Sequence, residues 1–376
     1  MSLRILCSGY LIRYPLGGFS WHHLQYLLGL QRMGHKVTYV EHHGWANSCY
    51  DPISNQQTAN PEYGLGYFKQ MAQGHGFKGN FCYLAEDGTS HGMKRADLAD
   101  ACAECDVYFN LSNMNWVAEF ELCRRRVLID TDPVFTQTGF GMGGPFSRYQ
   151  ALFTYGENVH KPRSSMPTGG HHWQATRQPV VLPEWKVEPG NPAAAFTTIM
   201  NWASYPEREH EGQVYGQKDR EFPPYYDLPR ESGLPMEIAI GGPPKVLDRL
   251  MLGDWSLADP REATRTPEVF QKYVRASRGE FSVAKHGYVS TRCGWFSDRS
   301  CCYLASGRPV ILQDTGFSDA LPCGEGLLAF ANLGEAKTAL WSVSERYEKH
   351  CEVARHVAKE YFDSDKVLRS LLERSL

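Results

Sequence analysis

Long apolar runs are absent from this chain of 376 residues. A helix that crosses a membrane needs roughly 20 consecutive apolar residues, and no stretch approaches that length, so we expect no integral membrane segment. The first nine residues are typical of a strand that leads into a glycine loop rather than of a signal peptide. The sequence therefore predicts a cytoplasmic protein.

An excess of one charge sign is also absent. The chain has 39 Lys and Arg against 42 Asp and Glu, which gives a formal net charge of −3. Proteins that bind nucleic acid usually carry a basic face, so this balance predicts that nucleic acid is not a partner. The length is sufficient for two domains, each with a core of its own.

Metal-site spacing is missing as well. The eleven cysteines follow no zinc or disulfide-framework spacing, so we expect reduced thiols. The C-x-x-C of Cys102 and Cys105 has no partner pair in the sequence, which favours a structural role. Three adjacent histidine pairs also lack zinc spacing: His22–His23, His42–His43 and His171–His172. The sequence predicts neither a metal nor a bound cofactor.

The first half of the chain is typical of a parallel α/β sheet. A strand over 3–7, a loop over 8–19 and a helix over 21–33, which Gly34 ends, lead to a strand over 37–40, and this is a βαβ unit. Residues 45–95 are rich in Gly, Asn, Gln and Tyr and predict an insertion of loops and helices. Further strands are expected at 107–111, 126–130 and 151–155, with a fourth candidate at 180–182.

Polar residues follow three of these strands, where open α/β sheets bind their ligands. They are Ser112–Asn113, Asp130–Asp132 and Gly156–Asn158. A carboxylate at Asp132 would serve as a base or hold an acceptor hydroxyl. The alternative is a turn, because Asp-Pro is good turn chemistry.

A stretch rich in Pro, Gly and Ala, residues 183–195, has the composition of a connection between domains. We therefore predict an N-terminal domain over 1–188 and a C-terminal domain over 189–376, with a last helix that can pack back on the first. Strands are expected at 196–200, 236–240 and 279–283 in the second domain. The turn at Gly241–Gly242 follows the middle one.

Residues 294–317 combine a loop, a helix start, a buried strand over 309–312 and a second loop. Ser297 or Asp298 can cap the helix, because a short side-chain oxygen accepts an orphan backbone N–H there. Arg299 and Ser300 lie in the first turn. The positive end of a helix dipole, a cation and hydroxyls in one place suit a diphosphate.

This segment resembles the donor-binding core of GT-B glycosyltransferases, in particular the bacterial family-4-like or group 1 families with the pattern E-A-x-A-x-G-x-P-V … D-x-G. Residues 302–310 and 314–316 follow it. Gly17–Gly18, His22 and the Gly-His-Lys-Val of residues 34–37 resemble the start of the same families. The two glutamates of these families, eight residues apart, are replaced here by Gly294 and Cys302, and Asp298 lies between them.

The resemblance implies two Rossmann-like domains whose parallel sheets face a central cleft. It implies transfer of a sugar from a nucleotide diphosphate sugar to a hydroxyl of a small-molecule or glycan acceptor, without a metal. His22 is then the predicted general base, with Asp132 second. The predicted donor-binding residues are Gly17, Gly18, Gly242, Ser297, Asp298, Arg299, Ser300, Asp314, Thr315 and Gly316.

Two other functions fit the same fold. One is a nucleotide-sugar epimerase or hydrolase. The other is a protein that binds a nucleotide sugar without turning it over, which the missing glutamates suggest.

Overall fold

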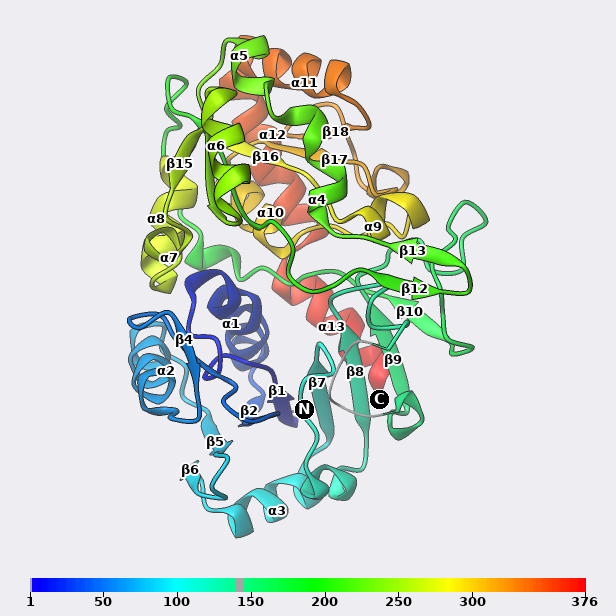
Figure 1. Ribbon diagram of the computed structural model, residues 1–376. Coiled ribbons are helices and arrows are strands. Elements are labelled where there is room, and N and C mark those ends of the chain that lie inside the picture. Colours follow the sequence, from blue (N-terminus) through cyan, green and yellow to red (C-terminus); the bar gives the residue numbers. More distant parts are fainter. Residues whose placement is uncertain (1, 140–144) are drawn as a thin grey trace.

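Two α/β lobes make up the computed structural model, which describes residues 2–139 and 145–376 (Figure 1). The first lobe contains an eight-stranded sheet in the order β10-β9-β8-β7-β1-β2-β5-β6. All neighbouring strands of this sheet are parallel except the β5–β6 pair. Its strands are β1 (Arg4–Ser8), β2 (Lys36–His42), β5 (Asn80–Leu84), β6 (Ser90–Gly92), β7 (Val107–Leu111), β8 (Arg126–Asp130), β9 (Ala151–Thr154) and β10 (Trp173–Ala175).

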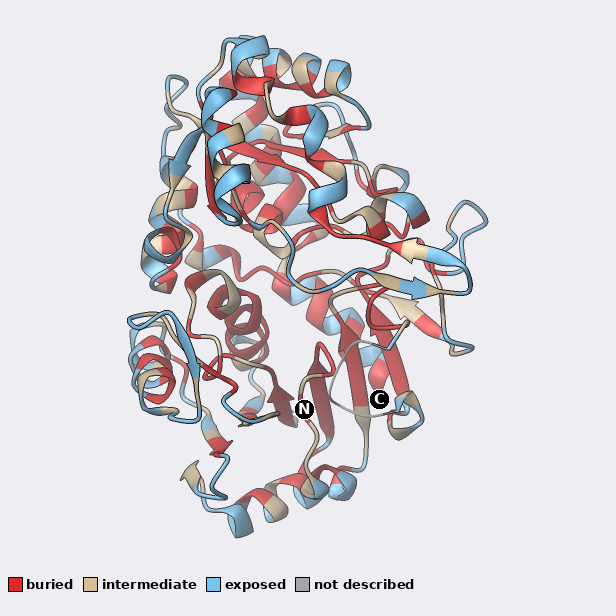
Figure 2. Ribbon diagram, in the orientation of Figure 1, coloured by how far each residue is buried: buried red, intermediate tan, exposed pale blue. Residues whose placement is uncertain are grey.

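The second lobe contains a six-stranded sheet in the order β15-β14-β11-β16-β17-β18, with every pair parallel. The strands are β11 (Phe196–Asn201), β14 (Met236–Gly241), β15 (Ser256–Ala258), β16 (Gly279–Ser282), β17 (Val310–Gln313) and β18 (Leu327–Phe330). Strands covered on both faces are mostly apolar and buried along their whole length, and β7, β16 and β17 are buried at every position (Figure 2).

Helices cover these sheets. In the first lobe they are α1 (Gly17–Arg32), α2 (Glu62–Gly74) and α3 (Arg95–Glu104), with 3₁₀ turns η1 (Ala118–Leu122) and η2 (Phe146–Arg148) and a hairpin of β3 (Cys49–Asp51) and β4 (Gln56–Thr58). The connection holds the 3₁₀ turn η3 (Leu182–Glu184). The second lobe has α4 (Lys218–Glu221), η4 (Pro223–Tyr225), α5 (Leu228–Ser232), α6 (Pro244–Leu252), α7 (Pro260–Ala263), α8 (Pro267–Ala276), α9 (His286–Thr291), α10 (Asp298–Ala305), η5 (Phe317–Asp319), α11 (Leu333–Glu345) and α12 (Tyr347–Tyr361), with a hairpin of β12 (Arg208–His210) and β13 (Gln213–Tyr215).

The chain crosses between the lobes twice, and the two crossings are hydrogen-bonded to each other. The Val180 amide donates to the Phe362 carbonyl at 2.6 Å, and the Ser364 amide donates to the Val180 carbonyl at 2.9 Å. The last helix, α13 (Ser364–Ser375), then packs on α1 of the first lobe. A Cβ at Gly29 of α1 would lie 2.5 Å from Leu368, so the two helices approach closely.

Three local predictions were wrong. Residues 45–95 include β5 and β6, which extend the main sheet, because five residues are enough for a strand that pairs with β2. Residues 180–182 form only a bridge and part of η3, since flanking prolines at 179 and 183 deny the backbone its donors. Helix α1 begins at Gly17 rather than at residue 21. In the part of the chain described, no helix has the length and apolar character to cross a membrane.

Candidate active site between the lobes

The strand order reverses beside the first strand of each lobe. In the first sheet β1 lies between β7 and β2, and in the second sheet β11 lies between β14 and β16. Open α/β sheets bind ligands at the carboxyl ends of the strands at such reversal points. A ligand site is therefore expected at the carboxyl ends of β1 and β11, where the strand order of each sheet reverses.

Arg299 fills a split between β11 and β16. These strands pair only at their first residues, up to Thr197 and Glu280, and then separate. The Arg299 guanidinium donates to the Ile199 carbonyl at 2.5 Å and to the Ser282 hydroxyl at 2.6 Å. Its Nε donates to Glu280 Oε1 at 2.5 Å. Arg299, which the sequence predicted as a donor-binding residue, thus joins the ends of β11 and β16 at this crevice.

Lys218, at the start of α4, is a buried ammonium group. Among the described residues no hydrogen bond or ion pair to its Nζ occurs. Burial holds the pKa of Lys218 well below its usual value, and the Arg299 charge lowers it further, while Glu280 acts in the opposite direction. Because the charges of Arg299 and Lys285 add to that of Lys218 here, this position suits an anionic ligand. No sequence pattern indicates this role of Lys218, because a single lysine in a polar stretch shows neither its burial nor its neighbours.

The start of α10 lies beside Lys218 and Arg299. Ser297 occupies the N-cap position without a side-chain cap bond, and the buried Ser300 hydroxyl has no partner in the described part of the chain. Asp298 Oδ2 lies 3.5 Å from His22 Nδ1, across the lobe boundary. Desolvation is the largest influence on Asp298 and acts to raise its pKa, but His22 and Arg299 together hold the pKa below its usual value.

The adjacent His22 and His23 have different partners. His23 Nδ1 donates to the Phe19 carbonyl at 2.8 Å, and its Nε2 accepts from the Tyr10 amide at 3.3 Å. Burial lowers the pKa of His23 to about 3, so this ring is neutral and structural. His22 has Asp298 at Nδ1, and its buried Nε2 has no partner among the residues described. Of the two, His22 is the ring with a nitrogen available for chemistry.

Asp132 is the centre of a second contact between the lobes. Lys285, which follows β16, donates to both Asp132 oxygens, at 2.9 and 3.0 Å. The Tyr205 hydroxyl donates to Asp132 Oδ2 at 2.6 Å, and the Tyr288 hydroxyl donates to Oδ1. Sequence reasoning singled out Asp132 but none of these three partners, which come from distant positions in the second lobe.

The predicted glycines serve close packing here. The Gly17 amide donates to the Thr264 carbonyl at 2.5 Å, and a Cβ at Gly17 would lie 2.3 Å from the Thr266 carbonyl oxygen. Gly18 lies against Phe270 of α8. Both glycines let α1 approach α8, and Gly242 lies at the exposed carboxyl end of β14. Their donor-binding role stays a prediction.

The loop of Asp314, Thr315 and Gly316 is held by local bonds. Asp314 accepts from the Gly316 amide at 2.8 Å, and the Thr315 hydroxyl donates to the Trp295 carbonyl at 2.6 Å. Asn158 of the first lobe donates to the Gly316 carbonyl at 2.8 Å. The loop thus joins the lobes, and its predicted contact with a donor also stays a prediction.

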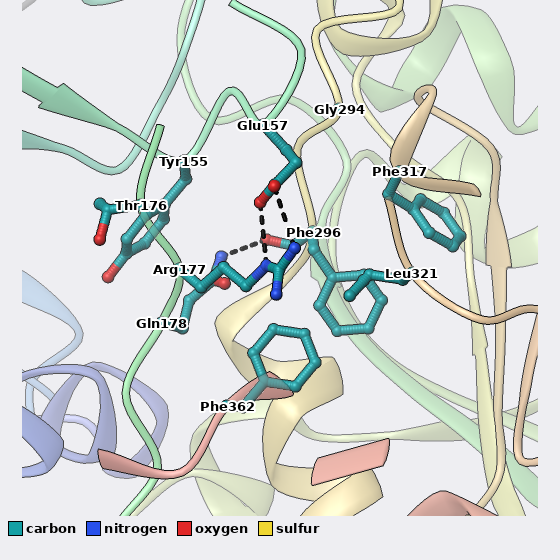
Figure 3. A pocket seen from close by; sticks show the side chains of 10 residues that line it. All are labelled: Tyr155, Glu157, Thr176, Arg177, Gln178, Gly294, Phe296, Phe317, Leu321 and Phe362. Carbon is teal, nitrogen blue, oxygen red and sulfur yellow. Dashed lines mark hydrogen bonds and ion pairs between the residues drawn. The ribbon is translucent and has the colours of Figure 1, made fainter. Parts of the chain in front are cut away.

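Two small cavities lie at the lobe boundary. One, of about 220 Å³, borders His22, Gln25 and Asp298. The other, of about 230 Å³, lies beside the Glu157–Arg177 ion pair, which faces three phenylalanines (Figure 3). Direct contacts between the lobes, His22–Asp298, Asp132–Lys285 and Asn158–Gly316, show that the lobes are closed on each other. The lining of the second cavity is Tyr155, Glu157, Thr176, Arg177, Gln178, Gly294, Phe296, Phe317, Leu321 and Phe362.

Solved structures of glycosyltransferases are similar to the whole chain. An α-glucosyltransferase in complex with UDP and a 13-mer DNA containing a HMU base matches over 100% of this chain and 99% of its own, with 11% identity and a TM-score of 0.59. HepE of Anabaena, in complex with UDP and glucose, matches over 99% of both chains, with 9% identity and a TM-score of 0.57. AviGT4, a glycosyltransferase involved in avilamycin A biosynthesis, covers 99% of this chain and 97% of its own, with 12% identity and a TM-score of 0.56.

No protein-family model and no curated protein matches this sequence. At these low identities the solved structures establish the fold alone. The chain has the GT-B fold, with two α/β lobes and large parallel sheets, as the sequence predicted.

The prediction that nucleic acid is excluded as a partner was wrong. Glucosyltransferases of the same fold are found in complex with DNA. The prediction rested on net charge, which averages over the whole surface, whereas a nucleic acid is bound by the charges of one local face.

Proposed function

We propose that this protein is a glycosyltransferase that moves a sugar from a nucleotide diphosphate sugar to a hydroxyl acceptor. The observation that carries the proposal is the side chain of Lys218, which has no ion pair among the described residues and lies near Arg299, the residue that fills the β11–β16 split. It lies with the N-terminus of α10 on one side of a closed lobe boundary, and His22 comes from the other side. An anion site opposite a histidine base fits transfer from an activated diphosphate.

Lys218 and the α10 dipole would neutralise the diphosphate as its bond to the sugar breaks. Arg299 acts through the strands it holds, because Glu280, Ile199 and Ser282 occupy its donors. The acceptor oxygen bonds to the anomeric carbon, and its proton must go to a base.

His22 is the proposed base, and the geometry selects its reactive nitrogen. Asp298 accepts hydrogen bonds as a carboxylate, so neutral His22 carries its proton on Nδ1 and leaves the Nε2 lone pair free. The acceptor proton would pass to Nε2, and Asp298 would stabilise the imidazolium that forms. Asp132 is the second candidate, but Lys285 and two tyrosines now engage its oxygens.

We also propose that the transfer needs no metal, because Lys218 and a helix dipole supply positive charge at the diphosphate. Activity should persist in EDTA. Loss of activity in EDTA with recovery in Mg²⁺ or Mn²⁺ would contradict this part of the proposal.

The test is a panel of nucleotide sugars, scored by release of the nucleoside diphosphate with and without acceptors. Small glycosides, oligosaccharides and DNA should all be included as acceptors, since a glucosyltransferase of this fold is found in complex with DNA. Release that depends on an acceptor supports a transferase, and free sugar without an acceptor indicates the hydrolase alternative. Binding without turnover indicates a sugar-nucleotide-binding protein. If no nucleotide sugar binds, the proposed function falls.

Lys218→Met is the matched variant for this panel. It should weaken binding of a nucleoside diphosphate about tenfold or more, as expected for a charge-assisted contact, and leave binding of the free nucleoside unchanged.

A further inference from the structure

The Asp132–Lys285 pair closes the cleft from opposite lobes. Asp132 follows β8 in the first lobe, and Lys285 follows β16 in the second. The Lys285 side chain is 14% exposed and also donates to the Tyr205 hydroxyl at 2.7 Å. In the described part of the chain, Asp132 is the one carboxylate in contact with this ammonium group.

Three aromatic rings pack around Lys285 and cover most of its side chain. Its Nζ lies 4.9 Å from the ring centre of Phe135, 4.5 Å from that of Tyr205 and 5.3 Å from that of Tyr288. Cation–π contacts offset part of the lost hydration, but a buried ammonium still needs an anion. Asp132 supplies it while no ligand is bound.

The loop that presents Asp132 is strained. Val134, two residues later, is fully buried and has φ of +74°. A β-branched residue is a genuine outlier in this left-handed region, and such strain persists only where the surroundings enforce it. Release of Asp132 would remove one of the contacts that hold this loop in place.

Lys285 belongs to the same crevice as Lys218, because the amide of His286, next to Lys285, donates to the carbonyl of Gln217, next to Lys218, at 3.3 Å. The charge of Lys285 is one of the causes that lower the pKa of Lys218, together with that of Arg299. A diphosphate at Lys218 would attract Lys285 and repel the Asp132 carboxylate. The two anions thus compete for one cation.

We propose that Asp132 is a built-in competitor of the donor: it occupies Lys285 in the closed resting state, and the incoming diphosphate displaces it. The inference rests on the proposed donor site. It makes Lys285 a second diphosphate-binding cation. Displacement of Asp132 also removes a contact that holds the lobes together and leaves a free carboxylate on the acceptor side of the cleft.

Calorimetric titration with inorganic pyrophosphate in EDTA tests the competition. Asp132→Asn should bind pyrophosphate about tenfold or more tightly than the wild type, because a charged competitor is gone. Asp319→Asn, which removes one carboxylate from an ion pair with Arg292, should stay within about twofold of the wild type as a control. The double variant Asp132→Asn/Lys285→Met should bind no more tightly than Lys285→Met.

Hydrogen exchange on the wild-type chain gives a second measurement that needs no variant. Pyrophosphate should slow exchange at residues 285–291 and speed it at residues 131–138, because the strained loop loses its partner. Unchanged or weaker binding by Asp132→Asn, or slower exchange of the 131–138 loop, overturns the inference. If the wild type and the variants all fail to bind pyrophosphate, the donor site itself is wrong and the proposed function falls with it.

Discussion

His22 and His23 are neighbours in sequence but point about 100° apart around α1. Both ring nitrogens of His23 are hydrogen-bonded to the backbone of Tyr10 and Phe19. His22 instead faces Asp298 with Nδ1, and its Nε2 has no partner among the described residues. The sequence pattern selected His22 by its place after the double glycine. The structure adds a physical reason for the difference between the two rings.

His22→Ala should lower turnover about a hundredfold or more while donor affinity stays nearly unchanged, because a general base acts on the acceptor proton. His23→Ala should instead lower the melting temperature, since the Tyr10 amide and the Phe19 carbonyl lose their partner. Steady-state kinetics and thermal denaturation of both variants separate the two effects. Near-normal turnover of His22→Ala would move the base elsewhere, with Asp132 next.

Lys218→Met should stabilise the ligand-free protein even as it weakens diphosphate binding. Burial lowers the pKa of Lys218, so the folded chain holds this proton less tightly than the unfolded chain and loses stability at neutral pH. Removing the charge should add on the order of 1 kcal/mol or more. Denaturant unfolding at pH 7 measures the change. A drop in stability would mean that Lys218 has a counter-ion in solution.

Lys218, Lys285 and Tyr205 could not be predicted as site residues. Each lies outside the family-like motifs and carries no local pattern. Their importance comes from burial and from partners far away in the chain, as when Tyr205 and Lys285 meet Asp132. Ser297–Ser300 could be found from sequence, because a helix start has a local signature.

At the scale of elements, the gap between β11 and β16 depends on one side chain. Arg299 binds a β11 carbonyl, a β16 hydroxyl and the fully buried Glu280. Where two neighbouring strands separate, their backbone N–H and C=O groups lose their hydrogen-bond partners unless a side chain replaces them. The same guanidinium also fixes the start of α10 relative to the sheet.

Arg299→Ala should therefore destabilise the second lobe rather than act on ligand affinity alone. Leaving a buried carboxylate unpaired costs about 3–5 kcal/mol. Arg346→Ala, which breaks an exposed pair with Glu325, should cost less than about 1 kcal/mol. Urea unfolding compares the two variants. Equal small losses would show that Glu280 finds another partner or a proton.

Buried apolar runs located nine of the fourteen strands of the two large sheets from sequence, and the matches at β7 and β8 are complete. Apolar runs did not predict strands correctly where pairing with a neighbouring strand decides whether a segment becomes a strand. β5 lies in a stretch of mixed polarity and becomes a strand because β2 offers it an edge. Residues 180–182 are apolar, yet prolines beside them prevent a ladder.

For the molecule as a whole, the sequence indicated two α/β units of GT-B type, and the fold agrees. Repeated strand and helix patterns suffice for that prediction, because few architectures accommodate them. The contacts that close the lobes on each other could not be predicted from the sequence, because they join distant loops, as the hydrogen bond from Asn158 to Gly316 does.

Acid should weaken the whole molecule through its buried histidines. Burial lowers the pKa of His23 to about 3 and that of His42 to about 4, whereas both titrate near 6.5 when unfolded. Between these values the unfolded chain binds more protons, so each ring costs about 1.4 kcal/mol per pH unit as the pH falls. Urea midpoints from pH 7 to 5 should fall less steeply for His23→Gln than for the wild type. Parallel profiles would show that His23 is protonated in the folded chain.

The paired crossings at Val180 and Phe362–Ser364 limit how the lobes can move. A single connecting segment would let the lobes rotate in any direction. Two segments that are hydrogen-bonded side by side define one hinge axis. Any opening is then a rotation with one main degree of freedom, and twisting or sliding is suppressed. A ligand that enters from the open edge would always meet the same sequence of side chains as the angle between the lobes closes.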